Sequence, residues 1–131
     1  MKRVSSYMKV LLIDDNKDIN DMVCLCLETQ DITVKVVDAG REGLRSIKEN
    51  HFDVILLDLA MPGFSGFDIF KALKDEGLLA SKNIVIFTAS SVTDNETQEM
   101  LLTGAKGVLK KPISIDDLIE TVERFRQDGH Q

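Results

Sequence analysis

The stretch that decides the fold of this chain is Val10-Leu11-Leu12-Ile13-Asp14-Asp15. Four apolar residues run directly into two acidic ones, and the arrangement returns in Val54-Ile55-Leu56-Leu57-Asp58. A short apolar run without polar alternation is typical of a strand buried on both faces of a parallel sheet. Ligands of such sheets bind beyond the carboxyl ends of the strands, where the strand order reverses. The two runs therefore predict that their terminal aspartates share one crevice.

Apolar blocks alternate with amphipathic stretches along the rest of the chain. The pattern predicts five strands, at Lys9–Ile13, Thr33–Val37, Val54–Leu57, Ile84–Phe87 and Gly107–Lys110. It predicts five helices between and after them, at Lys17–Thr29, Arg41–Asn50, Gly66–Asp75, Asp94–Leu102 and Ser114–Phe125. This alternation implies right-handed crossovers and an α/β, doubly wound parallel sheet. The pattern leaves the strand order open. The common flavodoxin-like order 2-1-3-4-5 would place the reversal between the two strands that end in aspartates.

Length and composition exclude several classes of protein. With 131 residues the chain is expected to form one domain over residues 8–126, with tails at 1–7 and 127–131. The net charge of −6 argues against nonspecific nucleic-acid binding, and no apolar run approaches the ~20 residues that a membrane span needs. Cys24 and Cys26 lie two apart in a predicted helix, so they face different ways and are expected to be reduced thiols of a cytoplasmic protein.

Two more predicted strands end in polar residues, Thr88 and Lys111. One edge of the sheet would then gather three carboxylates, a hydroxyl and an ammonium group. Like charges ~4 Å apart repel by roughly 4 kcal/mol at an effective dielectric of ~20, so a hard cation, most plausibly Mg²⁺, is expected there. The set suits phosphoryl transfer to a carboxylate, because one aspartate can act as nucleophile while the others hold the metal ion.

From about Met8 to Phe125 the chain resembles the response-regulator receiver domain of two-component signalling. Five motifs, in order and each at a predicted strand end, carry the resemblance: Asp14-Asp15, Asp58, Met61-Pro62-Gly63, Thr88-Ala89 and Lys111-Pro112. The resemblance implies a phospho-switch with a protein-interaction surface rather than a turnover enzyme.

The resemblance also implies a role for each site residue. Asp58 would be the phosphoacceptor, and Asp15, Asp58 and the backbone carbonyl of Ala60 would bind Mg²⁺ directly. Asp14 would act mainly through a metal-bound water. Thr88 would bind a phosphoryl oxygen, and Lys111 would pair with Asp58 at rest and with the phosphoryl group afterwards.

The phosphoryl donor, by the same resemblance, would be a phosphohistidine on a sensor histidine kinase or a histidine phosphotransfer protein. This partner is expected near Ile19, Asn20 and Val23 and around Pro112 and Ile113, with core packing of Ile19 and Val23 as the alternative. The Lys111–Pro112 peptide is expected to be cis. The downstream effector is not specified by the sequence.

The chain departs from the family pattern at three positions. Val108 stands where many receivers carry Tyr or Phe, three residues before the site lysine, so weaker coupling to the face made by the fourth helix, fifth strand and fifth helix is expected. Ala60 and Ser90 lie two residues beyond Asp58 and Thr88, where the family tunes the phosphoryl lifetime. Both are small, so little side-chain control of the attacking water is expected.

Three other interpretations remain open. A Mg²⁺-dependent phosphatase could use Asp58 as nucleophile, but haloacid-dehalogenase-like enzymes carry a second acid where this chain has Ala60. A flavin mononucleotide carrier needs a hydroxyl- and glycine-rich loop after the first strand, where this chain has Asp14-Asp15-Asn16-Lys17. A degenerate receiver that only docks partners would lack part of the site, yet all five residues are present.

Overall fold

The computed structural model describes residues 7–89 and 92–126 of the chain. The expectations for Ser90, for residues 1–6 and for residues 127–131 lie outside these described residues. Elements follow in the order β1 (Met8–Ile13), α1 (Lys17–Glu28), β2 (Ile32–Val37), α2 (Gly40–Glu49), β3 (Val54–Asp58), α3 (Gly66–Asp75), η1 (Leu79–Ser81), β4 (Ile84–Thr88), α4 (Asp94–Thr103), β5 (Gly107–Lys110) and α5 (Ile115–Glu123).

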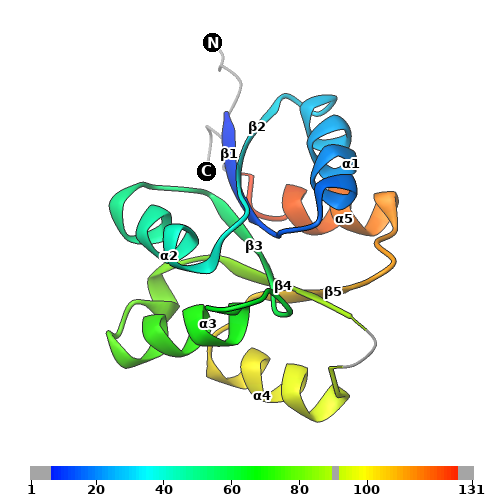
Figure 1. The fold of residues 1–131 in the computed structure, drawn as a ribbon. Helices are drawn as coiled ribbons and strands as arrows, with labels where there is room; N and C mark the ends of the chain where they lie inside the picture. Colours follow the sequence, from blue (N-terminus) through cyan, green and yellow to red (C-terminus); the bar gives the residue numbers. More distant parts are fainter. Residues whose placement is uncertain (1–6, 90–91, 127–131) are drawn as a thin grey trace.

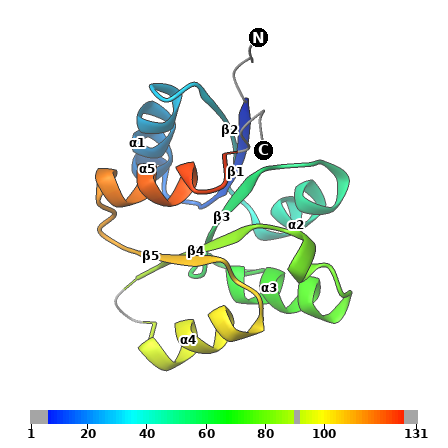
Figure 2. The same cartoon turned by 180° about the vertical axis from the view of Figure 1, so that it is seen from behind.

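The strands form one parallel sheet in the order β2-β1-β3-β4-β5. Helices α1 and α5 lie side by side against one face, and α2, α3 and α4 cover the other (Figure 1). The view from behind agrees (Figure 2). The predicted flavodoxin-like order 2-1-3-4-5 with five helices is confirmed.

Each strand feeds two separate apolar cores, because successive side chains of a strand point to opposite faces of the sheet. The side chains of the sheet that face α2, α3 and α4 are those of Leu11, Ile13, Ile55, Leu57, Ile84 and Ile86. The side chains that face α1 and α5 are those of Met8, Val10, Leu12, Val54, Leu56, Val85 and Phe87. Every residue of β3 and β4 is buried, which is the burial that the continuous apolar runs predicted.

The register of the sheet brings four strand ends to one edge. Ile13 pairs with both Val37 and Leu57, and Asp58 pairs with Phe87. Thr88 pairs with Lys110, the last residue of β5. The residues that end β3 and β4, or follow β1 and β5, therefore reach the same rim.

Short polar side chains fix where the helices begin beside this rim. Asn16 caps α1 by accepting a hydrogen bond from the Ile19 backbone N–H at 3.0 Å. Ser65 and Asp68 form a reciprocal capping box at the start of α3. Each such cap is worth about 1 kcal/mol. Gly66 opens α3 directly against the end of β3, where a Cβ atom would lie 2.1 Å from the Asp58 backbone oxygen.

The structure differs from the sequence prediction in a few local features. The single-turn 3-10 helix η1 was not predicted, because three residues carry no measurable periodicity. The apolar spacing of residues 66–75 predicts that Phe67, Phe70 and Leu73 face the core. Phe70 and Leu73 are buried, but Phe67 is 37% exposed and Ile69 takes the inward position in its turn of α3. Asp58 and Thr88 are the last residues of β3 and β4 rather than the first residues after them.

Candidate functional site at the carboxyl edge of the sheet

Asp58 lies at the centre of the edge, at the end of the middle strand of the sheet. It is 2% exposed. One of its oxygens, Oδ1, accepts a hydrogen bond from the backbone N–H of Ala60 at 3.2 Å and lies 3.3 Å from Lys111 Nζ. A buried carboxylate needs such partners, since an unpaired charge in the interior is costly.

Lys111 reaches across the edge to two aspartates at once. Its Nζ lies 3.1 Å from Asp14 Oδ2 as well as 3.3 Å from Asp58 Oδ1. The Lys111 backbone N–H donates to the Thr88 carbonyl at 2.8 Å, which fixes the base of the side chain beside β4. The contact with Asp14 was not predicted from the sequence. The Lys111–Pro112 peptide is cis, as expected.

Asp14 is fully buried and held from several sides. Its Oδ1 accepts from the Asn16 backbone N–H at 2.9 Å, and its Oδ2 accepts from Lys111. Burial raises the pKa of the Asp14 carboxyl above its usual value of 3.8, and the Asp58 charge adds to this rise. The Asn16 N–H and Lys111 act in the opposite direction without overcoming it.

Asp15 completes a cluster of three carboxylates. Unlike Asp14 and Asp58 it is exposed to solvent. One oxygen from each of the three lies within 4.8 Å of the others. Hard oxygen donors with one side open to water match Mg²⁺, which keeps several waters and binds through one or a few carboxylates. The donor set therefore fits the expected ion, and the exposed Ala60 lies beside it, bonded through its N–H to Asp58.

Thr88 ends β4 on the same edge and is 1% exposed. The structure thus gathers every site residue that the sequence predicted: Asp14, Asp15, Asp58, Ala60, Thr88 and Lys111. All six residues lie at the carboxyl edge of the sheet.

The expected docking residues on α1 do not lie on an exposed surface. Val23 is fully buried, Asn20 is 7% exposed, and Ile19 packs partly buried against the core between α1 and α5. The core-packing alternative is confirmed for Val23, and Asn20 is buried as well, so neither side chain is available to a partner; a docking surface near Ile19 and around the exposed Pro112 and the half-buried Ile113 stays a prediction. Residues three and four apart share one side of a helix, and here that side faces the sheet. The outer side of α1 instead exposes Leu25, at 69%.

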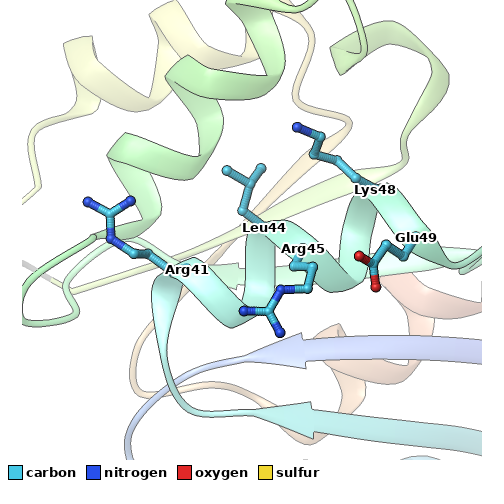
Figure 3. A pocket seen from close by; sticks show the side chains of 5 residues that line it. All are labelled: Arg41, Leu44, Arg45, Lys48 and Glu49. Carbon is cyan, nitrogen blue, oxygen red and sulfur yellow. The ribbon is translucent and has the colours of Figure 1, made fainter.

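A separate hollow of about 290 Å³ lies on α2 (Figure 3). Its lining is Arg41, Leu44, Arg45, Lys48 and Glu49. The Arg41 guanidinium stacks on the Phe64 ring at 4.5 Å, and Lys48 pairs with Glu76 on another segment. With three cations and a single carboxylate, the hollow offers neither a nucleophile with its base nor a ligand set for a metal ion, so it is not the reactive site.

None of the helices within residues 7–89 and 92–126 combines the length and the apolarity needed to cross a bilayer.

Comparison with proteins of known sequence shows clear similarity. The chain is 37% identical over 122 residues to the nitrate/nitrite response regulator protein homolog of Haemophilus influenzae, covering 92% of this chain and 57% of the relative. It is 30% identical to the cell cycle response regulator CtrA of Brucella ovis, covering 94% and 53%. The chain therefore spans just over half the length of these curated relatives.

Solved structures give the same result. The receiver domain of the Francisella response regulator 1452 superposes with a TM-score of 0.80 at 34% identity, over 90% of this chain and 95% of that one. The Vibrio cholerae chemotaxis protein CheY4 superposes with a TM-score of 0.78 at 31% identity, over 92% and 99%. Residues 10–123 match the response regulator receiver domain family, and the chain belongs to this family of two-component signalling switches.

Proposed function

We propose that this domain accepts a phosphoryl group on Asp58, with Mg²⁺ bound at the acidic cluster, and thereby switches a protein-interaction surface. The observation that supports this most is the environment of Asp58. It is a buried carboxylate at the middle strand end, 3.3 Å from an ammonium group and grouped with two further acids. Before phosphorylation, the Lys111 ammonium group offsets part of the negative charge of Asp58, and the added phosphoryl group would increase this negative charge.

The donor would be a phosphohistidine on a sensor histidine kinase or a histidine phosphotransfer protein. An Asp58 oxygen forms a bond to phosphorus while the P–N bond breaks. The electron pair of that bond stays on the imidazole, which leaves as neutral histidine when its other nitrogen carries a proton. Later hydrolysis by water returns inorganic phosphate and the Asp58 carboxylate.

Each residue of the edge has a distinct part in this scheme. Asp15, Asp58 and the Ala60 carbonyl would hold Mg²⁺, and Asp14 would act through water bound to it. The ion, when bound, neutralises charge on the phosphoryl oxygens. Lys111 would move its ion pair from Asp58 to a phosphoryl oxygen, and the Thr88 hydroxyl would donate to another. Positioning and charge account for most of the acceleration in such reactions.

The domain would act as a cytoplasmic switch rather than as a turnover enzyme. Its kinase and its downstream effector would be proteins. No nucleic acid would bind to this domain, because the net charge of the chain is −6.

Mass spectrometry of the intact protein tests the proposal. The wild type and Asp58→Asn are incubated with Mg²⁺ and acetyl phosphate, whose acetate group leaves as Asp58 attacks phosphorus. Gain of one phosphoryl group by the wild type alone is the expected result. Gain by both variants would place the acceptor elsewhere. Absence of gain with Mg²⁺ shown to bind, and with a histidine phosphodonor also inactive, would leave a docking module.

A further inference from the structure

Asn20 is a buried amide close to the acidic cluster that no role described so far uses. It lies in the first turns of α1 and is 7% exposed. Its Nδ2 donates a hydrogen bond of 2.8 Å to the backbone carbonyl of Asp14. The orientation of the amide follows from chemistry, because only the NH₂ end can donate to a carbonyl oxygen.

The other end of the same amide has no partner. Asn20 Oδ1 is buried without a hydrogen bond among the described residues. A buried acceptor left unsatisfied carries a desolvation cost that an apolar side chain of the same shape avoids. The unsatisfied Oδ1 offsets part of the stability that the Nδ2 bond contributes, so the effect of the amide comes from the bond that Nδ2 makes.

That bond fixes a peptide plane inside the site. The Asp14 carbonyl and the Asp15 N–H belong to one planar peptide unit. Holding the carbonyl sets the direction in which the Asp15 Cα and its carboxylate leave β1. Asp15 is the exposed member of the carboxylate cluster and is otherwise the least constrained of the three.

Two further bonds close the same loop. The Asn16 backbone N–H donates to Asp14 Oδ1 at 2.9 Å, and the Asn16 side chain caps α1. Asn20 and Asn16 thus both tie the start of α1 to Asp14 at the end of β1. Asp15 lies between Asp14 and Asn16 in the chain, so both of its neighbours are held.

We propose that Asn20 is a positioning residue for the metal site: its side-chain amide, bonded to the Asp14 carbonyl, holds the Asp14–Asp15 peptide so that the Asp15 carboxylate is preset for Mg²⁺. This inference rests on the proposed magnesium site. It replaces the expectation that Asn20 contacts a partner protein.

The ratio of Mg²⁺ to Ca²⁺ affinity can distinguish a role of Asn20 in positioning Asp15 from a role in stabilising the fold. Mg²⁺ demands nearly ideal octahedral geometry, whereas Ca²⁺ accepts flexible arrangements. Loss of the Asn20 bond should weaken Mg²⁺ binding by roughly tenfold, as is typical when a group that orients a ligand is removed. Ca²⁺ binding should weaken less, so the ratio of the two affinities should fall.

The experiment measures Mg²⁺ and Ca²⁺ dissociation constants by titration calorimetry for the wild type, Asn20→Leu and Asn83→Leu. Asn83 is a matched control, because its Nδ2 donates to the Asp53 backbone carbonyl at 2.9 Å at the opposite edge of the sheet. Urea denaturation reports the stability of each variant. Asn20→Ala serves as a second test variant because it removes the donor without adding bulk.

A lower Mg²⁺ to Ca²⁺ affinity ratio in the Asn20 variants, with Asn83→Leu like the wild type, is the expected result. Unchanged Mg²⁺ affinity, or equal weakening toward both ions, would overturn the positioning role while leaving the proposed function intact. A wild-type protein that binds no Mg²⁺ would overturn both together.

Discussion

Replacing Asp14 by asparagine should make the metal-free protein more stable while removing its response to Mg²⁺. Burial, aided by the nearby Asp58 charge, raises the pKa of the Asp14 carboxyl in the folded state. The folded protein then holds this proton over a pH range in which the unfolded chain has lost it. Stability is therefore lost as pH rises from the usual pKa of 3.8 through the raised value. The amide of the Asp14→Asn variant stays neutral and escapes this loss.

The magnitude follows from the geometry of the cluster. Carboxylate oxygens at the 4.8 Å limit of the cluster repel by roughly 3.5 kcal/mol per pair at an effective dielectric of about 20, so Asp15 and Asp58 together repel Asp14 by roughly 7 kcal/mol. The attraction between Asp14 and Lys111, at 3.1 Å, is roughly 5 kcal/mol on the same scale and offsets most of this repulsion. The introduced amide can still accept the Asn16 N–H bond through its own Oδ1, and Lys111 remains paired with Asp58. A net gain of about 1–3 kcal/mol at neutral pH is the expected result.

Urea denaturation followed by circular dichroism measures this gain, first with a chelator across the acidic to neutral range and then with Mg²⁺. The wild type should gain about 2.7 kcal/mol when Mg²⁺ is present at one hundred times its dissociation constant, and Asp14→Asn should gain much less. Asp53→Asn is the control, because Asp53 lies outside the acidic cluster and an amide oxygen can still accept the Lys9 backbone N–H that Asp53 Oδ2 now accepts at 2.8 Å, so no comparable gain in stability is expected. Parallel pH curves for wild type and Asp14→Asn, or a less stable variant at neutral pH with chelator, would refute the reasoning.

Three further predictions concern other parts of the fold. Gly66→Ala should lower the unfolding free energy by about 1–3 kcal/mol, because the new Cβ would meet the Asp58 backbone oxygen at 2.1 Å; unchanged stability in urea would show that α3 shifts freely. Burial raises the pKa of the Cys24 thiol, so less of it is in the reactive thiolate form at neutral pH. In a Cys26→Ser variant, iodoacetamide should therefore react with Cys24 more slowly than with the thiol of an unstructured peptide. An equal rate would contradict this. Because Val108 has no ring to move, a phosphoryl mimic should shift the backbone amide resonances of β5 only slightly; large shifts would show that the coupling persists.

The sequence predicts the frame of the site because few physical rules determine it. Buried parallel strands require continuous apolar runs, and the residue that follows such a run emerges at the carboxyl edge of the sheet. The ends of β1, β3, β4 and β5 could therefore be placed on one rim without coordinates. The family resemblance then supplied roles for the residues on that rim.

The details of the side chains depend on distances that no sequence pattern contains. The contact between Lys111 and Asp14 depends on how far the sheet twists between β1 and β5, which do not pair. The inward position of Asn20 could be deduced only from the exact phase of α1 against the sheet, and a polar residue in an apolar pattern gives a weak phase signal. The exposure of Phe67 also depends on the phase of its helix, because Ile69 and Phe70 fill the inward positions of that turn of α3.

The bond between Lys111 and Asp14 joins residues 97 positions apart in the chain. Closing a loop of this length costs chain entropy before the contact can form, which slows folding relative to local contacts. While a nascent chain lacks β5, its acidic residues have no lysine to offset their repulsion, and docking of the last strand supplies it. The attraction of the Lys111 ammonium group to Asp14 and Asp58 thus becomes available only when the last strand docks, and it stabilises the completed fold.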